Sequence, residues 1–183
     1  MIPDEKFINI LGEYYVVYMI FNVTLENRKI LIAGGGKIAE RKIKTLLAEN
    51  PIIHVISPET TEFIEKLSDE GRIELTRKMI ELGDINENYF MVLCATDNRD
   101  VNNMVSDICK NRNILHDNSG NHKNSDIMMT ASAHIGGITV AISTDGSSPE
   151  TSKRLKNLLI QDLKTSEYSF EDTIKAIYHK KML

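Results

Sequence analysis

One stretch of twenty residues constrains the fold of this chain more than any other. Residues 30–49 read ILIAGGGKIAERKIKTLLAE, so an apolar run ends in three glycines and an amphipathic run follows them. A short apolar run closed by glycine predicts a buried strand. The apolar residues after the glycines are Ile38, Ala39, Ile43, Leu46 and Leu47. Their spacing predicts a helix with one buried face, so we expect a strand, a glycine turn and a helix in that order.

The alternation of strands and helices continues to about residue 118. We predict strands at 52–56, 72–76 and 89–95 and from 114 onward, and helices at 60–71 and after a cap at Thr96 or Asp97. Strands that are almost continuously apolar are typical of a parallel sheet with helices on both faces. The pattern therefore predicts an α/β, Rossmann-like fold, in which ligands bind beyond the carboxyl ends of the strands.

A different pattern begins after residue 126. Apolar and polar residues alternate over 127–135 and 138–142, on either side of Gly136–Gly137, which predicts a half-exposed hairpin. Ser148–Pro149 predicts the start of a helix, and residues 170–180 predict a last, shorter one. We therefore divide the chain into a Rossmann-like domain at 1–118, a smaller α+β hairpin region at 119–148 and a C-terminal helical region at 149–183.

The glycines fit the dinucleotide-binding fingerprint, as Gly34-x-Gly36-x-x-Ala39. The first glycine allows the tight turn, the second lets the backbone approach a pyrophosphate, and the small third residue lets the helix pack closely on the strand. The amides of Gly36, Lys37 and Ile38 then face the phosphates from the helix N-terminus. We predict a bound dinucleotide here, and the alternative is a glycine turn with a purely structural use.

Two further segments are expected at the same edge of the sheet. The residues after the second strand are Ser57, Pro58 and Glu59, and a side chain or backbone group among them is predicted to hold the adenosine ribose. No arginine stands among them to neutralise a 2′-phosphate, which favours NAD over NADP. Thr96 and Asp97 end a later strand and are predicted to border the nicotinamide half, the alternative being that they only cap a helix.

Composition narrows the function classes and the compartment. The net charge of −4 gives no general affinity for nucleic acid or for an anionic membrane. The apolar run at 14–21 is too short to span a bilayer and lacks the basic flank of a signal peptide. Cys94 and Cys109 have no metal-ligand spacing and lie in apolar segments, so we predict buried thiols, no metal site and a cytoplasmic location.

Four segments together resemble the precorrin-2 dehydrogenase family, which includes the amino-terminal module of bacterial siroheme synthase. They are ILIAGGGKIAERKIKTLL, HVISPE, CATDNRDVNNMVSDICK and ITVAISTDGSSPETSKRLKNLL. The resemblance implies an NAD-dependent oxidation of precorrin-2 to sirohydrochlorin, and some relatives also insert ferrous iron to give siroheme. It further implies a homodimer in which the second part of each chain, with 119–148 as the dimerisation and substrate region, helps to build the partner's active site.

The implied substrate carries several carboxylates, so its site needs cations and hydrogen-bond donors. The predicted binding residues are Lys123, Ser143, Thr144, Ser147, Ser148 and Arg154, with His122, His134 and Lys153 as further candidates. The four hydroxyl residues precede a predicted helix, where amides and hydroxyls can bind a carboxylate. The alternatives are solvated charges for the basic residues and helix capping alone for the hydroxyl residues.

The chain departs from the family pattern at a position where the family usually has an aspartate. Counted without gaps, that position holds Gly120, and Thr130 stands where a proline is common. We therefore predict Asp117 as the general base, with His134 or no protein base as the alternatives. Three hypotheses follow: an NAD-dependent dehydrogenase, a bifunctional dehydrogenase and ferrochelatase, and a non-catalytic NAD- or tetrapyrrole-binding module, which Gly120 favours.

Overall fold

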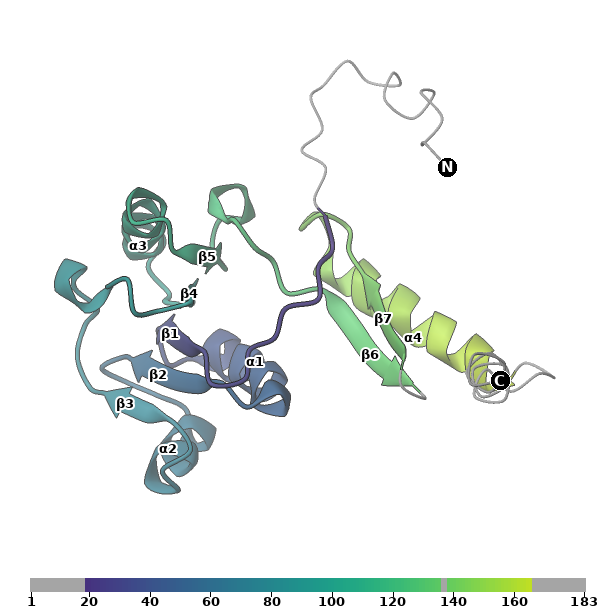
Figure 1. The fold of residues 1–183 in the computed structure, drawn as a ribbon, viewed down its shortest axis with the longest axis horizontal. Helices are drawn as coiled ribbons and strands as arrows, with labels where there is room; N and C mark the ends of the chain where they lie inside the picture. The colour runs from purple at the N-terminus through teal and green to yellow at the C-terminus, as the bar shows by residue number, and fades with distance from the viewer. Residues whose placement is uncertain (1–18, 136–137, 166–183) are drawn as a thin grey trace, which may run out of the picture. The chain divides into compact units, whose positions relative to one another are not determined.

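A computed structural model describes residues 19–135 and 138–165 of the chain (Figure 1). The described residues divide into two compact units, of which the first spans Val23–Met129 and the second begins at Thr130 and includes residues 19–22. The turn predicted at 136–137 and the helix predicted at 170–180 lie outside the described residues. The functional boundaries at residues 118 and 148 stay predictions.

The first unit alternates strands and helices as the sequence predicts. Its elements are β1 (Lys29–Ala33), α1 (Lys37–Leu46), β2 (Ile52–Ile56), α2 (Glu62–Asp69), β3 (Glu74–Thr76), β4 (Met91–Cys94), α3 (Arg99–Asn111) and β5 (Leu115–Asn118). The strands lie in the order β3-β2-β1-β4-β5, and all neighbours are parallel. The order reverses between β1 and β4, and ligands of doubly wound sheets bind in the crevice at such a reversal. The predicted Rossmann-like fold is confirmed.

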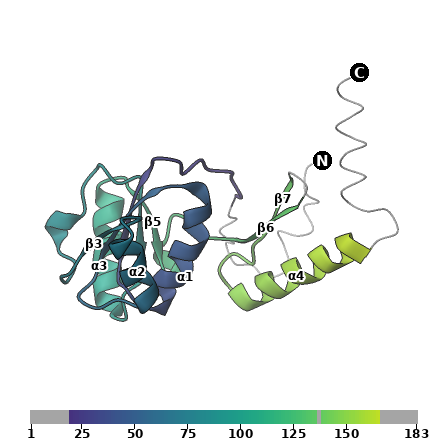
Figure 2. The same ribbon diagram turned by 90° about the horizontal axis from the view of Figure 1, so that it is seen from below.

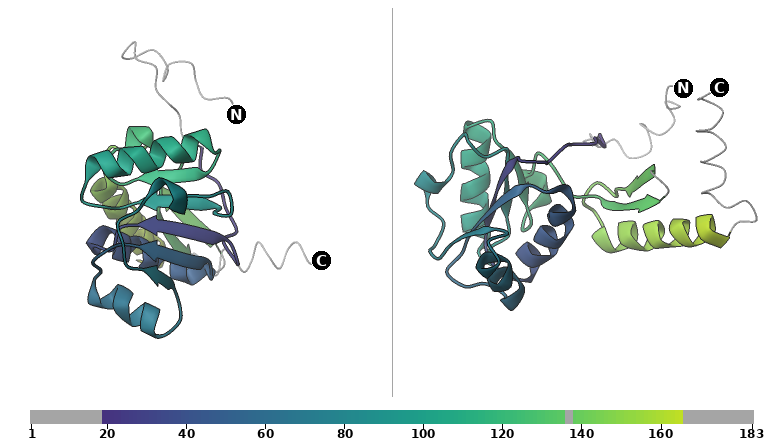
Figure 3. Two further views of the ribbon diagram at one scale, coloured as in Figure 1. Left: turned by 90° about the vertical axis from the view of Figure 1, so that its left-hand side faces the viewer. Right: turned by 60° about the horizontal axis from the view of Figure 1, so that its bottom comes forward.

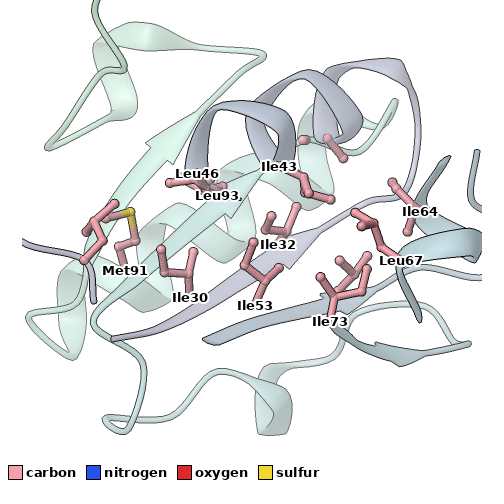
Figure 4. Packing of buried hydrophobic residues seen from close by; sticks show 14 residues of the cluster. Ile30, Ile32, Ile43, Leu46, Ile53, Ile64, Leu67, Ile73, Met91 and Leu93 are labelled. Atoms are coloured by element: carbon pink, nitrogen blue, oxygen red, sulfur yellow. The ribbon is translucent and has the colours of Figure 1, made fainter. Parts of the chain in front are cut away.

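Two apolar cores cover the two faces of this sheet. On one face, Ile32 of β1 packs in a cluster with Ile43 of α1 and Ile64 of α2 (Figure 4). On the other face, Leu31 of β1 belongs to a cluster with Val105 of α3. The right-hand view of Figure 3 shows α1 and α3 on opposite sides of the strands. Successive strand residues point to opposite faces, so a continuous apolar run is buried by helices on both sides.

Two local predictions within this unit are wrong. Ile38 was expected in the apolar stripe of α1, but its side chain is 42% exposed, and the buried face begins at Ala39. The cap of α3 is Asn98 rather than Thr96 or Asp97, since the Asn98 side chain accepts hydrogen bonds from two amides of the first helical turn, at 2.9 and 3.2 Å. The loop between β4 and α3 is therefore longer than predicted, and Thr96 and Asp97 do not cap the helix.

The second unit contains the predicted hairpin and a helix. β6 (Ala131–Ile135) and β7 (Ile138–Ile142) pair antiparallel, and α4 (Pro149–Thr165) lies along them (Figures 1 and 2). The Ser148 hydroxyl accepts a hydrogen bond from the amide of Thr151 at 3.3 Å, so the predicted cap of this helix is confirmed. Ile127, which we expected to begin the hairpin, instead packs against the core of the first unit. None of the helices in the described residues is long and apolar enough to cross a membrane.

Candidate functional site

The three glycines after β1 differ in whether the fold requires them. Gly34 has a φ of +111°, and a Cβ added to it would lie 2.4 Å from the carbonyl oxygen of Ala95. A Cβ on Gly35 would lie 2.3 Å from the carbonyl oxygen of Glu59. A Cβ on Gly36 would meet no atom within 4 Å, so the fold itself does not require this glycine. The first two glycines permit the turn, and the third leaves space in front of the helix.

A cleft of about 560 Å³ opens at this turn, at the carboxyl edge of the sheet. Its lining residues are Gly34, Gly35, Gly36, Lys37, Ile38, Ile56, Ser57, Pro58, Glu59, Met79, Ile80, Ala95, Thr96, Asp97, Asn98 and Val101. Every residue that the sequence assigned to the cofactor is among them. The first hydrogen bond of α1 runs from the amide of Glu40 to the carbonyl of Gly36 at 3.0 Å. The amides before Glu40 have no intrahelical acceptor, and such amides at a helix N-terminus bind phosphate groups.

The turn after β2 forms one end of the cleft. The buried hydroxyl of Ser57 donates a hydrogen bond to the carbonyl of Glu59 at 2.6 Å, which fixes the shape of this turn. The amide of Thr61 donates to the carbonyl of Gly35 at 3.0 Å, so the turn is tied to the glycine loop. The Glu59 side chain is exposed and lines the cleft. The Ser57 hydroxyl therefore orders the turn, and the Glu59 carboxylate is exposed at the cleft.

The loop after β4 forms the other end, and one residue that the sequence analysis missed holds it. The side chain of Asn102 in α3 accepts hydrogen bonds from the amide and the hydroxyl of Thr96, at 3.1 and 2.7 Å. Its amide group donates to the Thr96 carbonyl at 2.9 Å. Asn102 is only 2% exposed, so these bonds are shielded from water. Asn102 lies on the buried face of α3 together with Val105 and Cys109, and a polar residue at core spacing is the sequence signal that would have identified it.

Two more residues that the sequence does not single out form an ion pair next to the turn after β2, where Glu65 accepts a hydrogen bond from the Thr60 hydroxyl. Arg77 follows β3, and its guanidinium donates to both carboxylate oxygens of Glu65 in the first turn of α2, with Nη1 2.9 Å from Oε1. Because parallel strands end at one edge of the sheet, residues after the neighbouring β3 also lie at this edge, and Met79 and Ile80 line the cleft.

The predicted base, Asp117, is buried in an ion pair. Its Oδ2 lies 2.5 Å from the Nζ of Lys42 in α1, and the two side chains are only 8% and 10% exposed. Neither residue lines the cleft. The pair links β5 to α1 in a region that is shielded from water, where removing one partner leaves an uncompensated charge.

Gly120 lies close to the Asn102 side chain. A Cβ added to Gly120 would be 3.4 Å from Nδ2 of Asn102 and 3.5 Å from Oδ1 of Asn118, which are ordinary van der Waals distances. The Gly120 amide donates to the same Asn118 oxygen at 3.0 Å. The backbone therefore has room for a side chain at position 120, so the fold would accommodate the aspartate that the family usually has there.

The predicted substrate residues of the second unit fall into one cluster and two separate positions. The Thr144 hydroxyl donates to the Ser148 carbonyl at 2.9 Å, and the Ser147 hydroxyl donates to the Thr144 carbonyl at 2.6 Å. Ser143 accepts the amide of Asp145 at 3.0 Å. These hydroxyls form a hydrogen-bonded turn in front of α4. His134, whose Nδ1 lies 2.9 Å from the Thr139 hydroxyl, is exposed on β6, and Arg154 is exposed on α4. In the first unit, Lys123 is exposed in a short helical turn after β5.

Comparisons with known proteins agree with this geometry. Residues 21–131 match a family described as putative NAD(P)-binding. The chain is 33% identical to precorrin-2 dehydrogenase of Bacillus subtilis (strain 168), over 73% of this chain and 82% of the relative. It is 31% identical to precorrin-2 dehydrogenase of Priestia megaterium, over 87% and 76%. A solved structure, "SirC, precorrin-2 dehydrogenase", matches 89% of this chain and 78% of that chain, with a TM-score of 0.72 and 29% identity.

A second group of relatives is longer than this chain. The siroheme synthase of Actinobacillus pleuropneumoniae serotype 3 (strain JL03) is 28% identical over 78% of this chain, but the match covers only 29% of that protein.

Proposed function

Because the chain belongs to the precorrin-2 dehydrogenase family, we propose that it oxidises precorrin-2 to sirohydrochlorin in siroheme biosynthesis, with NAD as the oxidant. The cleft at the carboxyl edge of the sheet is the observation that carries this proposal. Its glycine turn leaves open the space that a side chain on Gly36 would fill, and a pyrophosphate requires such a space. NAD supplies the carbon that accepts a hydride, and the residues of this chain hold it in place.

Each part of the cleft has its own role in holding NAD. The amides of Gly36, Lys37 and Ile38 bind the pyrophosphate at the start of α1. The turn at Ser57–Glu59 binds the adenosine ribose, with Glu59 as the acceptor for its hydroxyls. Thr96 and Asp97 border the nicotinamide, and Asn102 keeps that loop in one conformation through its three hydrogen bonds to Thr96. Hydride transfer depends mostly on correct positioning, and a fixed loop provides it.

The hydroxyl cluster in front of α4 is proposed to bind carboxylates of the tetrapyrrole. Ser143, Thr144, Ser147 and Ser148 supply hydroxyls, and Arg154 and Lys123 supply positive charge. All four hydroxyls already donate within the turn or the first turn of α4, so a bound carboxylate takes the place of one of these acceptors. This arrangement favours one carboxylate at the helix start rather than a separate site for each hydroxyl.

Oxidation of precorrin-2 also releases a proton, and Asp117 is proposed to accept it. Its pairing with Lys42 requires that the carboxylate exchange one partner for another during the reaction. His134 is the alternative acceptor, since its ring is exposed and has a hydrogen bond to Thr139 only through Nδ1. A general base typically contributes a factor of about 10² to 10⁴ to the rate, so its removal is readily measured.

We also propose that the chain acts as a homodimer in the cytoplasm. On α4, Leu155, Leu158 and Leu159 are exposed at helical spacing, so the helix carries an uncovered apolar stripe. The free, buried thiols of Cys94 and Cys109 fit a reducing compartment. Light scattering at micromolar concentration should give the mass of two chains, and Leu158→Glu should lower it to that of one. A monomeric wild-type protein would exclude the dimer.

The direct test is incubation of the purified protein with precorrin-2 and NAD, followed by the absorbance of sirohydrochlorin. The product should form with NAD and not without it. Ferrous iron is then added to the same reaction, and conversion of the sirohydrochlorin spectrum to that of siroheme would reveal a second, chelatase activity. NAD binding without any oxidation would favour the non-catalytic module instead.

A further inference from the structure

The end of β3 brings two basic residues to the edge where the adenosine half of NAD is proposed to bind. Arg77 and Lys78 follow Thr76, whose carbonyl accepts the amide hydrogen of Ser57 at 3.1 Å. Met79, the next residue, lines the cleft. A guanidinium at this edge has the chemistry that recognises the 2′-phosphate of NADP, because it binds phosphate oxygens with two parallel hydrogen bonds.

Both basic residues are already engaged by carboxylates. Arg77 makes a bidentate pair with Glu65, and the Thr60 hydroxyl donates to the same carboxylate. Arg77 and Thr60 together hold the pKa of Glu65 below its usual range, so this carboxylate stays charged at neutral pH. The Nζ of Lys78 lies 2.8 Å from a carboxylate oxygen of Asp84.

Glu65 stands next to the phosphate-binding turn. The Thr60 methyl group lies 2.5 Å from the position that a Cβ on Gly35 would occupy, so Thr60 packs directly on the glycine loop. The Thr60 hydroxyl and Nη1 of Arg77 both donate to Oε1 of Glu65, and Nη2 of Arg77 donates to Oε2. One carboxylate therefore engages both the hydroxyl of Thr60, which packs on the glycine loop, and the guanidinium of Arg77, which is two residues before the cleft-lining Met79.

We propose that Glu65 selects NAD over NADP by sequestering the Arg77 guanidinium and the Thr60 hydroxyl, which would otherwise bind a 2′-phosphate. This inference rests on the NAD site proposed above. A 2′-phosphate would have to displace Arg77 from a bidentate partner and would then lie beside an unpaired carboxylate. NADP is thus rejected by a repulsive group, while NAD, which has a neutral 2′-hydroxyl, is unaffected.

The test is a calorimetric titration of wild type and Glu65→Gln with NAD and with NADP. Glutamine keeps the size of the side chain and removes its charge. We expect NADP to bind Glu65→Gln at least about tenfold more tightly than wild type, the scale of one charge-assisted hydrogen bond, while NAD affinity changes less than about twofold. The double variant Glu65→Gln/Arg77→Ala should lose the gain, because the gain requires the freed guanidinium.

Glu62→Gln is the matched control, since Glu62 is an exposed residue of the same helical turn and its loss changes the net charge equally. The proposal would be overturned if Glu62→Gln gained the same NADP affinity, or if the gain persisted in Glu65→Gln/Arg77→Ala. An unchanged NADP affinity in both Glu65→Gln and Glu65→Ala would also overturn it. Unchanged NAD affinity and thermal unfolding show that each variant is folded. A wild-type protein that binds no NAD would refute the proposed cofactor site itself, which is a separate result.

Discussion

Replacing Gly36 by aspartate should weaken NAD binding by roughly a hundredfold without disturbing the fold. Gly36 has a φ of −81°, which any residue adopts, and a Cβ at this position would meet no atom within 4 Å. A side chain there therefore projects into open space at the start of α1. The same space must hold the pyrophosphate if the amides of Gly36, Lys37 and Ile38 bind it. The substitution thus separates binding from folding, which a change at Gly34 cannot do.

The size of the effect follows from charge and bulk together. At an effective dielectric constant of about 20, two unit charges about 5 Å apart repel by about 3 kcal/mol. The pyrophosphate carries two charges, and solvent at the open cleft screens part of the repulsion. A net loss of about 3 kcal/mol corresponds to NAD affinity lowered by roughly a hundredfold.

Gly36→Asn is the matched control, because asparagine has the size of aspartate without its charge. Isothermal calorimetry should show a moderate loss of NAD affinity for Gly36→Asn and a much larger one for Gly36→Asp, with both proteins unfolding at the wild-type temperature. NAD affinity within twofold of wild type in a folded Gly36→Asp protein would refute the placement of the pyrophosphate. Equal losses in the two variants would show that bulk and not charge is responsible.

Three further predictions concern the residues around the cleft. Asp117→Asn should lower the rate of sirohydrochlorin formation at least tenfold. It should also destabilise the fold by about 3–5 kcal/mol, because Lys42 is left buried and unpaired. Adding Lys42→Met should restore the free energy of unfolding, measured with denaturant, but not the rate of sirohydrochlorin formation. Asn102→Ala should weaken NAD binding about tenfold in titrations and lower the free energy of unfolding by about 1–3 kcal/mol, because buried polar groups of Thr96 lose their partners. Unchanged NAD affinity would contradict the role of Asn102 in holding the loop after β4. Burial raises the pKa of the Cys94 and Cys109 thiols to about 12, so almost no thiolate exists at pH 8. A thiol reagent should therefore modify neither residue until the protein is unfolded. Rapid labelling of the native protein would contradict this prediction.

Much of the first unit follows from local sequence patterns. The strand β2 has the predicted bounds, and β1 ends before the glycines as predicted, because each is a mostly apolar run that ends at a turn signal. The role of Gly34 also follows from the fingerprint, and its positive φ confirms the tight turn. These features depend on a few neighbouring residues, so the sequence alone suffices to predict them.

The features that sequence reasoning missed depend on contacts between distant segments. Arg77 and Glu65 are twelve residues apart, and the parallel pairing of β2 with β3 brings them into contact. Lys42 and Asp117 are 75 residues apart and lie on elements that nothing in the sequence pairs. Ile38 has the spacing of a core residue, but the helix starts at the cleft, so its first turn faces open space instead of apolar side chains.

The central claim is that the glycine cleft holds the NAD that oxidises precorrin-2. Single-turnover mixing of the protein with precorrin-2 and NAD, followed by the absorbance of NADH and of sirohydrochlorin together, tests it most directly. We predict one NADH for each sirohydrochlorin in the wild type, because one hydride and one proton leave the substrate. At an NAD concentration near the wild-type Kd, we predict almost none of either product in Gly36→Asp. Sirohydrochlorin that forms without NADH, or equal yields in the two proteins, would contradict the claim.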